Sequence, residues 1–130
     1  MKIIDIKPNV ILSSMGNETV EVTLFFASGQ SSASVPAGIS AGQFEVQNVS
    51  PDKAISQIEN IKNKLINVDF SQENLDKLLI EENLAGNASL PISAAFWKYG
   101  LKNQTYTKFP KLFLLLFEGG KHGNGGISIQ

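Results

Sequence analysis

The chain is predicted to be an α+β domain, because strand-like segments come first and helix-like segments follow them. Residues 2–12 are rich in Ile and Val, and residues 19–27 alternate apolar with polar side chains, the period of a half-buried strand. Residues 51–100 instead space their apolar side chains three and four positions apart, as in helices with one buried face. With 130 residues the chain has the length of one domain. We therefore expect a three-stranded antiparallel sheet followed by a helical layer.

The three strands are expected between residues 2 and 35. The first covers 2–12, with Pro8 and Asn9 as a break. Residues 19–27 form the second strand, Ser28-Gly29-Gln30 a short turn, and 31–35 the third strand. The last two strands therefore pair as an antiparallel hairpin.

Three helices are expected in the second half. Ser50 can cap the first helix, and Pro51 suits its first position. Ser71 starts the second helix, and the third covers 88–99, with Pro91 tolerated because it lies in the first turn. The side chains expected to be buried are Ile55, Ile58, Ile61, Leu75, Leu78 and Leu79, and Trp97 and Tyr99 are also expected to pack.

A continuous apolar run, FPKLFLLLF, occupies residues 109–117 and is typical of a strand covered on both faces. Without neighbouring strands, we expect it to be buried against the domain's own sheet or helices, or between two copies of the chain. Residues 118–126 then form a loop with five glycines in nine residues. This loop lacks the glycine spacing of a nucleotide-binding P-loop.

Composition excludes several classes of function. The net charge of −1, from 11 basic and 12 acidic residues, gives no electrostatic case for nucleic acid or an anionic membrane. The absence of cysteine excludes disulfides, zinc–thiolate sites and thiol nucleophiles. The first residues lack the apolar region of a signal peptide, and the apolar run is far shorter than the roughly 20 residues of a membrane-spanning helix. The expected location is the cytoplasm.

Four stretches, in order, resemble motifs of enolase. SMGNETVEV at 14–22 is similar to the family's SRGNPTVEV, and VPAGISAGQFE at 35–45 resembles VPSGASTGxHE. GNASLPIS at 86–93 is similar to ANAILGVS. GGKH at 119–122 matches the family's GG(K/S)H, and Gln130 matches the Gln of its QE pair at the same spacing. The resemblance implies an amino-terminal cap domain over 1–108, followed at 109–130 by the first barrel strand and its loop, with the rest of the barrel absent.

The resemblance implies a magnesium-dependent lyase, phosphopyruvate hydratase, which converts 2-phosphoglycerate to phosphoenolpyruvate and water in glycolysis. Ser40 would be a magnesium ligand on a lid loop hinged at Gly38 and Gly42, and His122 and Gln130 would contact the substrate. Serine oxygens suit Mg²⁺, and His122 is the only side chain here that titrates near neutral pH unperturbed. No catalytic acid, base or carboxylate metal ligand of the family falls within the chain, so the isolated 130 residues are predicted to be inactive.

Alternatives remain open at this point. From residue type alone the Ser40 loop is more simply an ordinary turn and His122 a solvated side chain, and it is the resemblance that favours the lid and substrate roles. Met15 and Glu18 stand where the family has Arg and Pro, and Leu115 and Glu118 where it has Asn. These departures favour a non-catalytic enolase-like binding or structural module as the second hypothesis, and the Met15 change weakens the expectation of a family-type homodimer. An acid-sugar or muconate-type relative is the third, disfavoured by the 35–45 and 119–122 matches.

Overall fold

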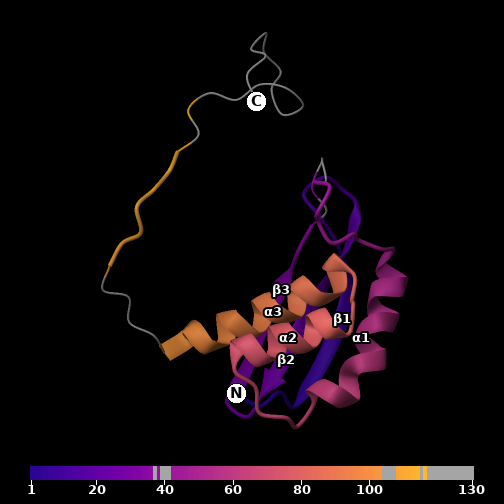
Figure 1. Cartoon of the computed structure of the whole chain (residues 1–130), viewed down its shortest axis with the longest axis vertical. Helices are drawn as coiled ribbons and strands as arrows, with labels where there is room; N and C mark the ends of the chain where they lie inside the picture. The colour runs from indigo at the N-terminus through magenta and orange to yellow at the C-terminus, as the bar shows by residue number, and fades with distance from the viewer. Residues whose placement is uncertain (37, 39–41, 104–107, 115, 117–130) are drawn as a thin grey trace.

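The computed structural model describes residues 1–36, 38, 42–103, 108–114 and 116, in which three strands precede three helices (Figure 1). The strands β1 (Asp5–Leu12), β2 (Glu18–Phe26) and β3 (Gly29–Ser34) form an antiparallel sheet in the order β1-β2-β3. The helices are α1 (Pro51–Leu65), α2 (Gln72–Glu81) and α3 (Gly86–Gly100), followed by a 3₁₀ turn at Leu101–Asn103. The predicted α+β order and the antiparallel sheet are confirmed.

The first strand differs from its prediction. The expected break at Pro8 and Asn9 is wrong, since both lie within β1, where Pro8 is opposite Val22 of β2. A proline is tolerated here because β1 is an edge strand, with one side unpaired and free of any need for a backbone N–H.

The hairpin between β2 and β3 is also tighter than predicted. Phe26 pairs with Gly29, so the turn consists of Ala27 and Ser28, not of residues 28–30. Gly29 already belongs to β3 and has a φ of +140°, a conformation that side chains disfavour. A two-residue connection is the commonest for strands with the natural twist.

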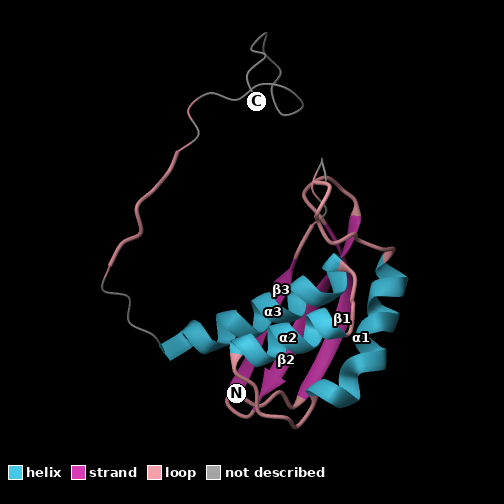
Figure 2. Cartoon of the chain, in the orientation of Figure 1, coloured by secondary structure: helices cyan, strands magenta, loops and turns pink. Residues whose placement is uncertain are grey.

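All three helices lie on one side of the sheet (Figure 2). α1 contacts β1 and β2, α3 contacts β2 and β3, and α2 packs against α3. Within the described part of the chain, none of these helices is long and apolar enough to cross a membrane.

The starts of the helices follow the sequence only in part. Pro51 is the first residue of α1 as predicted, but Ser50 makes no side-chain capping bond. Ser71 does cap α2, accepting a hydrogen bond from the Asn74 amide at 3.2 Å. The placement of Pro91 in a first turn is wrong, because α3 begins at Gly86 and Pro91 is buried in its second turn.

The core lies between the sheet and the helices, and most of the predicted core residues belong to it. Ile58, Ile61, Leu75 and Leu79 are buried, whereas Ile55 and Leu78 are half-buried at its margin. Tyr99 stacks on Phe26 with 3.7 Å between ring centroids and 8° between planes, so its predicted packing role holds. The predicted packing of Trp97 is wrong, because its side chain is 54% exposed on the outer side of α3.

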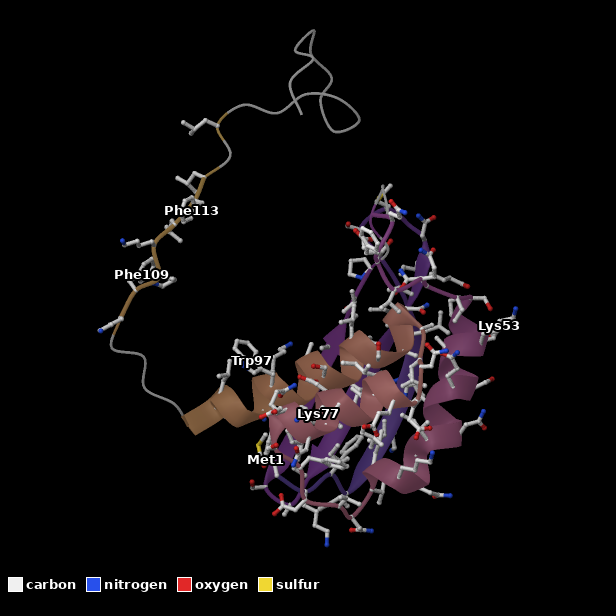
Figure 3. All side chains as sticks on the ribbon, in the orientation of Figure 1. Met1, Lys53, Lys77, Trp97, Phe109 and Phe113 are labelled. Carbon is white, nitrogen blue, oxygen red and sulfur yellow. The ribbon has the colours of Figure 1, made fainter. Side chains whose placement is uncertain are left out.

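The described residues of the segment 109–117 are not buried within their own chain. These residues, 109–114 and 116, form no helix or strand and lie apart from the sheet and helices (Figure 3). Phe113 is 97% exposed and Leu116 79%. The expectation of burial against the domain's own sheet or helices is therefore wrong for these residues, while burial between two copies stays a prediction.

One ion pair connects the end of α1 to the edge strand. The Lys62 ammonium lies 2.9 Å from Asp5 Oδ1 and donates to the Ile6 carbonyl at 3.0 Å. The hydrogen bond from Lys62 lowers the pKa of Asp5 below its usual 3.8, helped by the Ile6 amide. The hydrogen bond to Asp5 raises the pKa of Lys62 above its usual 10.5.

Removing this pair should give a pH-dependent loss of stability. Asp5 has a lowered pKa when folded, so its contribution is complete above 3.8 and disappears as pH falls through the lower folded value. Lys62 has a raised pKa, so its contribution is complete below 10.5 and disappears as pH rises through the higher value. Asp5→Asn should therefore lower the free energy of unfolding by up to about 1 kcal/mol near neutral pH. In urea titrations the difference from the unmutated chain should vanish at strongly acid pH. A difference that persists there, or one matched by Glu81→Gln, would contradict this account.

Candidate functional site

The candidate site is the loop between β3 and α1, residues 35–50, which carries the predicted serine. The structure describes both ends of this loop, with Gly38 and Gly42 exposed, but Ser40 lies outside the described residues. His122 and Gln130 also lie outside them, as do Leu115 and Glu118. The described ends of the loop set where it leaves the domain and where it returns.

The first end is held by the hairpin between β1 and β2. Thr19 is buried and donates a hydrogen bond through Oγ1 to the Val35 carbonyl at 3.1 Å. The tip of the hairpin closes through the Ser13 amide, which donates to the Asn17 carbonyl at 2.8 Å, and Gly16 adopts a φ of +78°. Pro36 and residues 13–15 and 17–19 surround a small hollow of about 110 Å³. The start of the loop is thus fixed against the end of the sheet.

The second end is held by the first turn of α3. The Asn87 side chain accepts a hydrogen bond from the Val49 amide at 3.1 Å and donates one to the Val49 carbonyl at 2.7 Å. Its amide group therefore satisfies both backbone groups of one residue, as a neighbouring strand would. The Gly86 amide adds a third bond, to the Gln47 carbonyl at 3.0 Å. Asn87 is only 5% exposed, so these bonds are shielded from water. We call Asn87 and its two bonds to Val49 the Asn87 clamp.

Gly86 shows how closely the loop approaches α3. A Cβ at this position would lie 2.7 Å from Asn48 Oδ1 and 3.1 Å from the Val46 carbonyl oxygen. The enolase-like motif has Ala here, and in this chain the Asn48 side chain occupies the space of that methyl group. Glycine at position 86, where the motif has alanine, therefore makes room for the Asn48 side chain of the loop.

The described residues do not supply a metal site. They contain no group of three or more His, Cys, Asp or Glu side chains placed to hold an ion. Mg²⁺ needs several oxygen ligands in near-octahedral geometry, which the two loop ends do not offer. They can position a loop, but the chemistry would have to come from groups elsewhere.

A second polar cluster was not predicted from the sequence. The Gln72 Nε2 of α2 donates to both carboxylate oxygens of Asp76, at 3.0 and 3.2 Å, and to Ser93 Oγ of α3 at 3.0 Å. This cluster lies in a groove between α2 and α3. Its three members come from two helices, and only Ser93 lies in a matched stretch, so the packing of the helices is what reveals the cluster.

A sheet backed by helices, with a long loop held at both of its ends, defines an α+β domain that presents a loop. The chain belongs to the enolase family, since residues 3–110 match its amino-terminal domain, described as "Enolase, N-terminal domain". The chain is 33% identical to the enolase of Methanothrix thermoacetophila, over 92% of this chain and 36% of that protein. It is 32% identical to the enolase of Thermoplasma acidophilum and 28% identical to that of Pelagibacter ubique, over 97% and 99% of this chain. It spans 37% and 38% of those two proteins, so it covers less than two fifths of each relative's length.

The clamp should contribute measurably to stability. Asn87→Ala would leave the amide and carbonyl of Val49 without their partners, and should lower the free energy of unfolding by about 2 kcal/mol. Hydrogen exchange of the Val49 amide should accelerate as well. Asn60→Ala, a change at an exposed position of α1, is the matched control and should cost nothing. Unchanged exchange at Val49, with stability equal to that of the control, would rule out an anchoring role for Asn87.

Proposed function

We propose that the chain is the amino-terminal part of an enolase, phosphopyruvate hydratase, which converts 2-phosphoglycerate to phosphoenolpyruvate and water in glycolysis in the cytoplasm. Residues 1–108 would be the cap domain and 109–130 the first barrel strand with its loop. The observation that carries the proposal is the convergence of three enolase-like stretches on one loop. Thr19 of the first and Asn87 of the third hold the two ends of the loop that contains the second.

Within this proposal, Ser40 is a magnesium ligand on a lid hinged at Gly38 and Gly42. A hydroxyl and a backbone carbonyl are both oxygen donors of the kind that Mg²⁺ prefers. The metal would stabilise the negative charge that develops when a proton is removed next to the substrate carboxylate. The anchored loop ends support this role, because a ligand on a loop is useful only if the loop returns to the same place. The remaining metal ligands, and the acid and base, would come from outside the chain.

His122 and Gln130 are the proposed contacts to 2-phosphoglycerate or phosphoenolpyruvate. Their glycine-rich loop follows the apolar run directly, so the first barrel strand would deliver both residues to the same end of the barrel. A histidine suits this position because its charge changes near neutral pH. A homodimer of the whole protein belongs to the same proposal.

A specific observation keeps a second function in view, that of a non-catalytic enolase-like binding module. Met15 is 63% exposed at the hairpin tip, beside the hollow that adjoins Pro36. Glu18 lines the same hollow. Met15 stands where the family motif has Arg, and Glu18 where it has Pro. The surface beside the loop therefore lacks the positive charge of that Arg and carries a carboxylate instead. A partner other than the enolase substrate would explain these exchanges.

The 130-residue chain alone should show no measurable dehydration of 2-phosphoglycerate. A general acid and a general base each contribute roughly 10²–10⁴-fold to such reactions, and the proposal places both outside this chain. Phosphoenolpyruvate absorbance is the assay, with the Methanothrix enolase as positive control. Magnesium should also bind poorly, and calorimetry that gave micromolar affinity would contradict the proposed division of ligands.

A chimera tests the proposal directly. Residues 1–108 would replace the amino-terminal domain of the Methanothrix enolase, and the folded chimera should form phosphoenolpyruvate. Ser40→Ala should then lower kcat by at least about 10²-fold, the size of effect seen when one preorganised electrostatic group is lost. Ser34→Ala, at the exposed end of β3, is the matched control and should leave kcat unchanged.

Two outcomes would count against the enzyme. If the Ser40→Ala chimera were as active as the Ser34→Ala control, the lid role of Ser40 would be wrong. If the chimera folded, shown by circular dichroism and gel filtration, but formed no phosphoenolpyruvate, the binding module would become the better account.

A further inference from the structure

Two lysines form hydrogen bonds to the backbone of β3 along its free edge. β3 is the outermost strand on its side of the sheet. The Lys98 ammonium donates to the Ser32 carbonyl at 2.7 Å. The Lys102 ammonium donates to the Gln30 carbonyl at 2.6 Å. Residues two apart in a strand direct their backbone groups to the same side, so the amides of Gln30 and Ser32 face this edge as well. A free edge of this kind can pair with a further strand.

The two lysines are spaced to reach this edge together. Lys98 lies in α3 and Lys102 lies four residues later, in the 3₁₀ turn that follows, which is about 6 Å along a helix. Their acceptors are two residues apart in β3, roughly 6.6 Å along a strand. The Lys102 ammonium also lies 5.0 Å from the centre of the Tyr99 ring, and Tyr99 stacks on Phe26 of β2. Both ammonium groups are therefore held where the backbone of an added strand would have to lie.

The two ammonium groups are bound to the sheet itself and not to acidic side chains. Among the described residues, the lysines that pair with carboxylates are Lys62, Lys64 and Lys77. Lys98 and Lys102 have backbone carbonyls as their acceptors instead. A charged donor forms a stronger hydrogen bond than the neutral amide of an incoming strand, so a strand that displaced both ammonium groups would lose free energy by the exchange.

The opposite edge of the sheet, on β1, is closed in a comparable way. The Lys62 ammonium donates to the Ile6 carbonyl at 3.0 Å, and the Ile6 amide donates to Asp5 Oδ1 at 2.9 Å. Pro8, two residues further along β1, has no amide hydrogen to offer. Charged side chains, lysine above all, and proline are the residues with which natural sheets prevent strand addition at their edges.

We propose that the free edge of β3 is a strand-addition surface that Lys98 and Lys102 hold closed. Its partner is an extended segment of another polypeptide, whose amides bond to the carbonyls of Gln30 and Ser32 once both ammonium groups have left them. β2 shows the kind of sequence that fits, because β3 already pairs with β2 along its other side. The proposal rests on backbone groups within the described sheet and does not depend on the proposed enzyme.

Peptide binding tests the closed edge in the 130-residue chain. The probe is a capped peptide with the sequence of residues 18–24, ETVEVTL, which is taken from β2. Lys98→Met combined with Lys102→Met removes both ammonium groups and keeps long apolar side chains. By fluorescence anisotropy, this double variant should bind the labelled peptide roughly tenfold or more tightly than the unmutated chain, because no charged donor has to be displaced. Hydrogen exchange of the Ser32 amide should slow when the peptide is bound.

The sign of the effect separates strand addition from attraction between charges. The peptide carries two glutamates, so the loss of two lysines would weaken a binding that was merely electrostatic. Lys53→Met combined with Lys77→Met removes the same charge at exposed positions of α1 and α2, and should not tighten binding. Lys98→Arg combined with Lys102→Arg keeps two charged donors and should leave the edge closed.

A proline at the edge supplies the last control. Ser32→Pro, added to the double methionine variant, removes the amide that faces the edge, as Pro8 does on β1, and should abolish the gain in affinity. The proposal is overturned if the double methionine variant binds no more tightly than the unmutated chain, if the Lys53 and Lys77 control gains as much, or if Ser32→Pro leaves the gain intact. Urea titration shows whether each variant folds. If the double methionine variant does not fold, Lys98→Met and Lys102→Met singly should each give a smaller gain, and its absence in both would overturn the proposal.

Discussion

The two hydrogen bonds between the Asn87 side chain and Val49 are the constraint on which the loop geometry depends. They fix the returning end of the loop to α3, and α3 packs directly on β2 and β3. The departing end is fixed to the same sheet through Thr19 and Val35. Both described ends of the loop are therefore attached to the same layer of sheet and α3, so the packing of helix on sheet sets where the loop begins and where it ends.

Much of the fold could be predicted because periodicity reports burial on one face, which is a local property of the sequence. The errors fall where local rules meet a tertiary context. A proline breaks a central strand but is tolerated in an edge strand such as β1, which contains Pro8. Whether a strand lies at the edge depends on the order of the strands in the sheet, which is not a local property of the sequence. The predicted helix began at residue 88, which placed Pro91 in the first turn. α3 instead begins two residues earlier, at Gly86, where the Gly86 amide and the Asn87 side chain form hydrogen bonds to the loop. Trp97 is apolar enough for a core, yet it is 54% exposed because no described helix or strand covers that face of α3.

The sequence predicted which loop forms the candidate site, but not which side chains hold the two ends of that loop. The resemblance to enolase marked the stretches that contain Thr19 and Asn87, but gave neither residue a role. Their partners lie 16 and 38 positions away in the chain, and no spacing rule connects a side chain to a backbone group at such separations. The sequence did not indicate the cluster of Gln72, Asp76 and Ser93, although Ser93 lies in a matched stretch, because the three side chains meet only when α2 and α3 lie side by side.

The space beside Gly86 has a consequence for how this sequence can evolve. The Asn48 side chain fills the volume that a methyl group at position 86 would need, so the two positions are not free to change independently. An ancestor with alanine at 86 would have had to hold residue 48 in another rotamer or have a smaller residue there. Starting from the present pair, a change at 48 removes the 2.7 Å contact and leaves only the 3.1 Å approach to the Val46 carbonyl oxygen, whereas the opposite order passes through a more crowded intermediate. Positions 48 and 86 should therefore covary among descendants of this chain, with the order of substitution constrained by sterics.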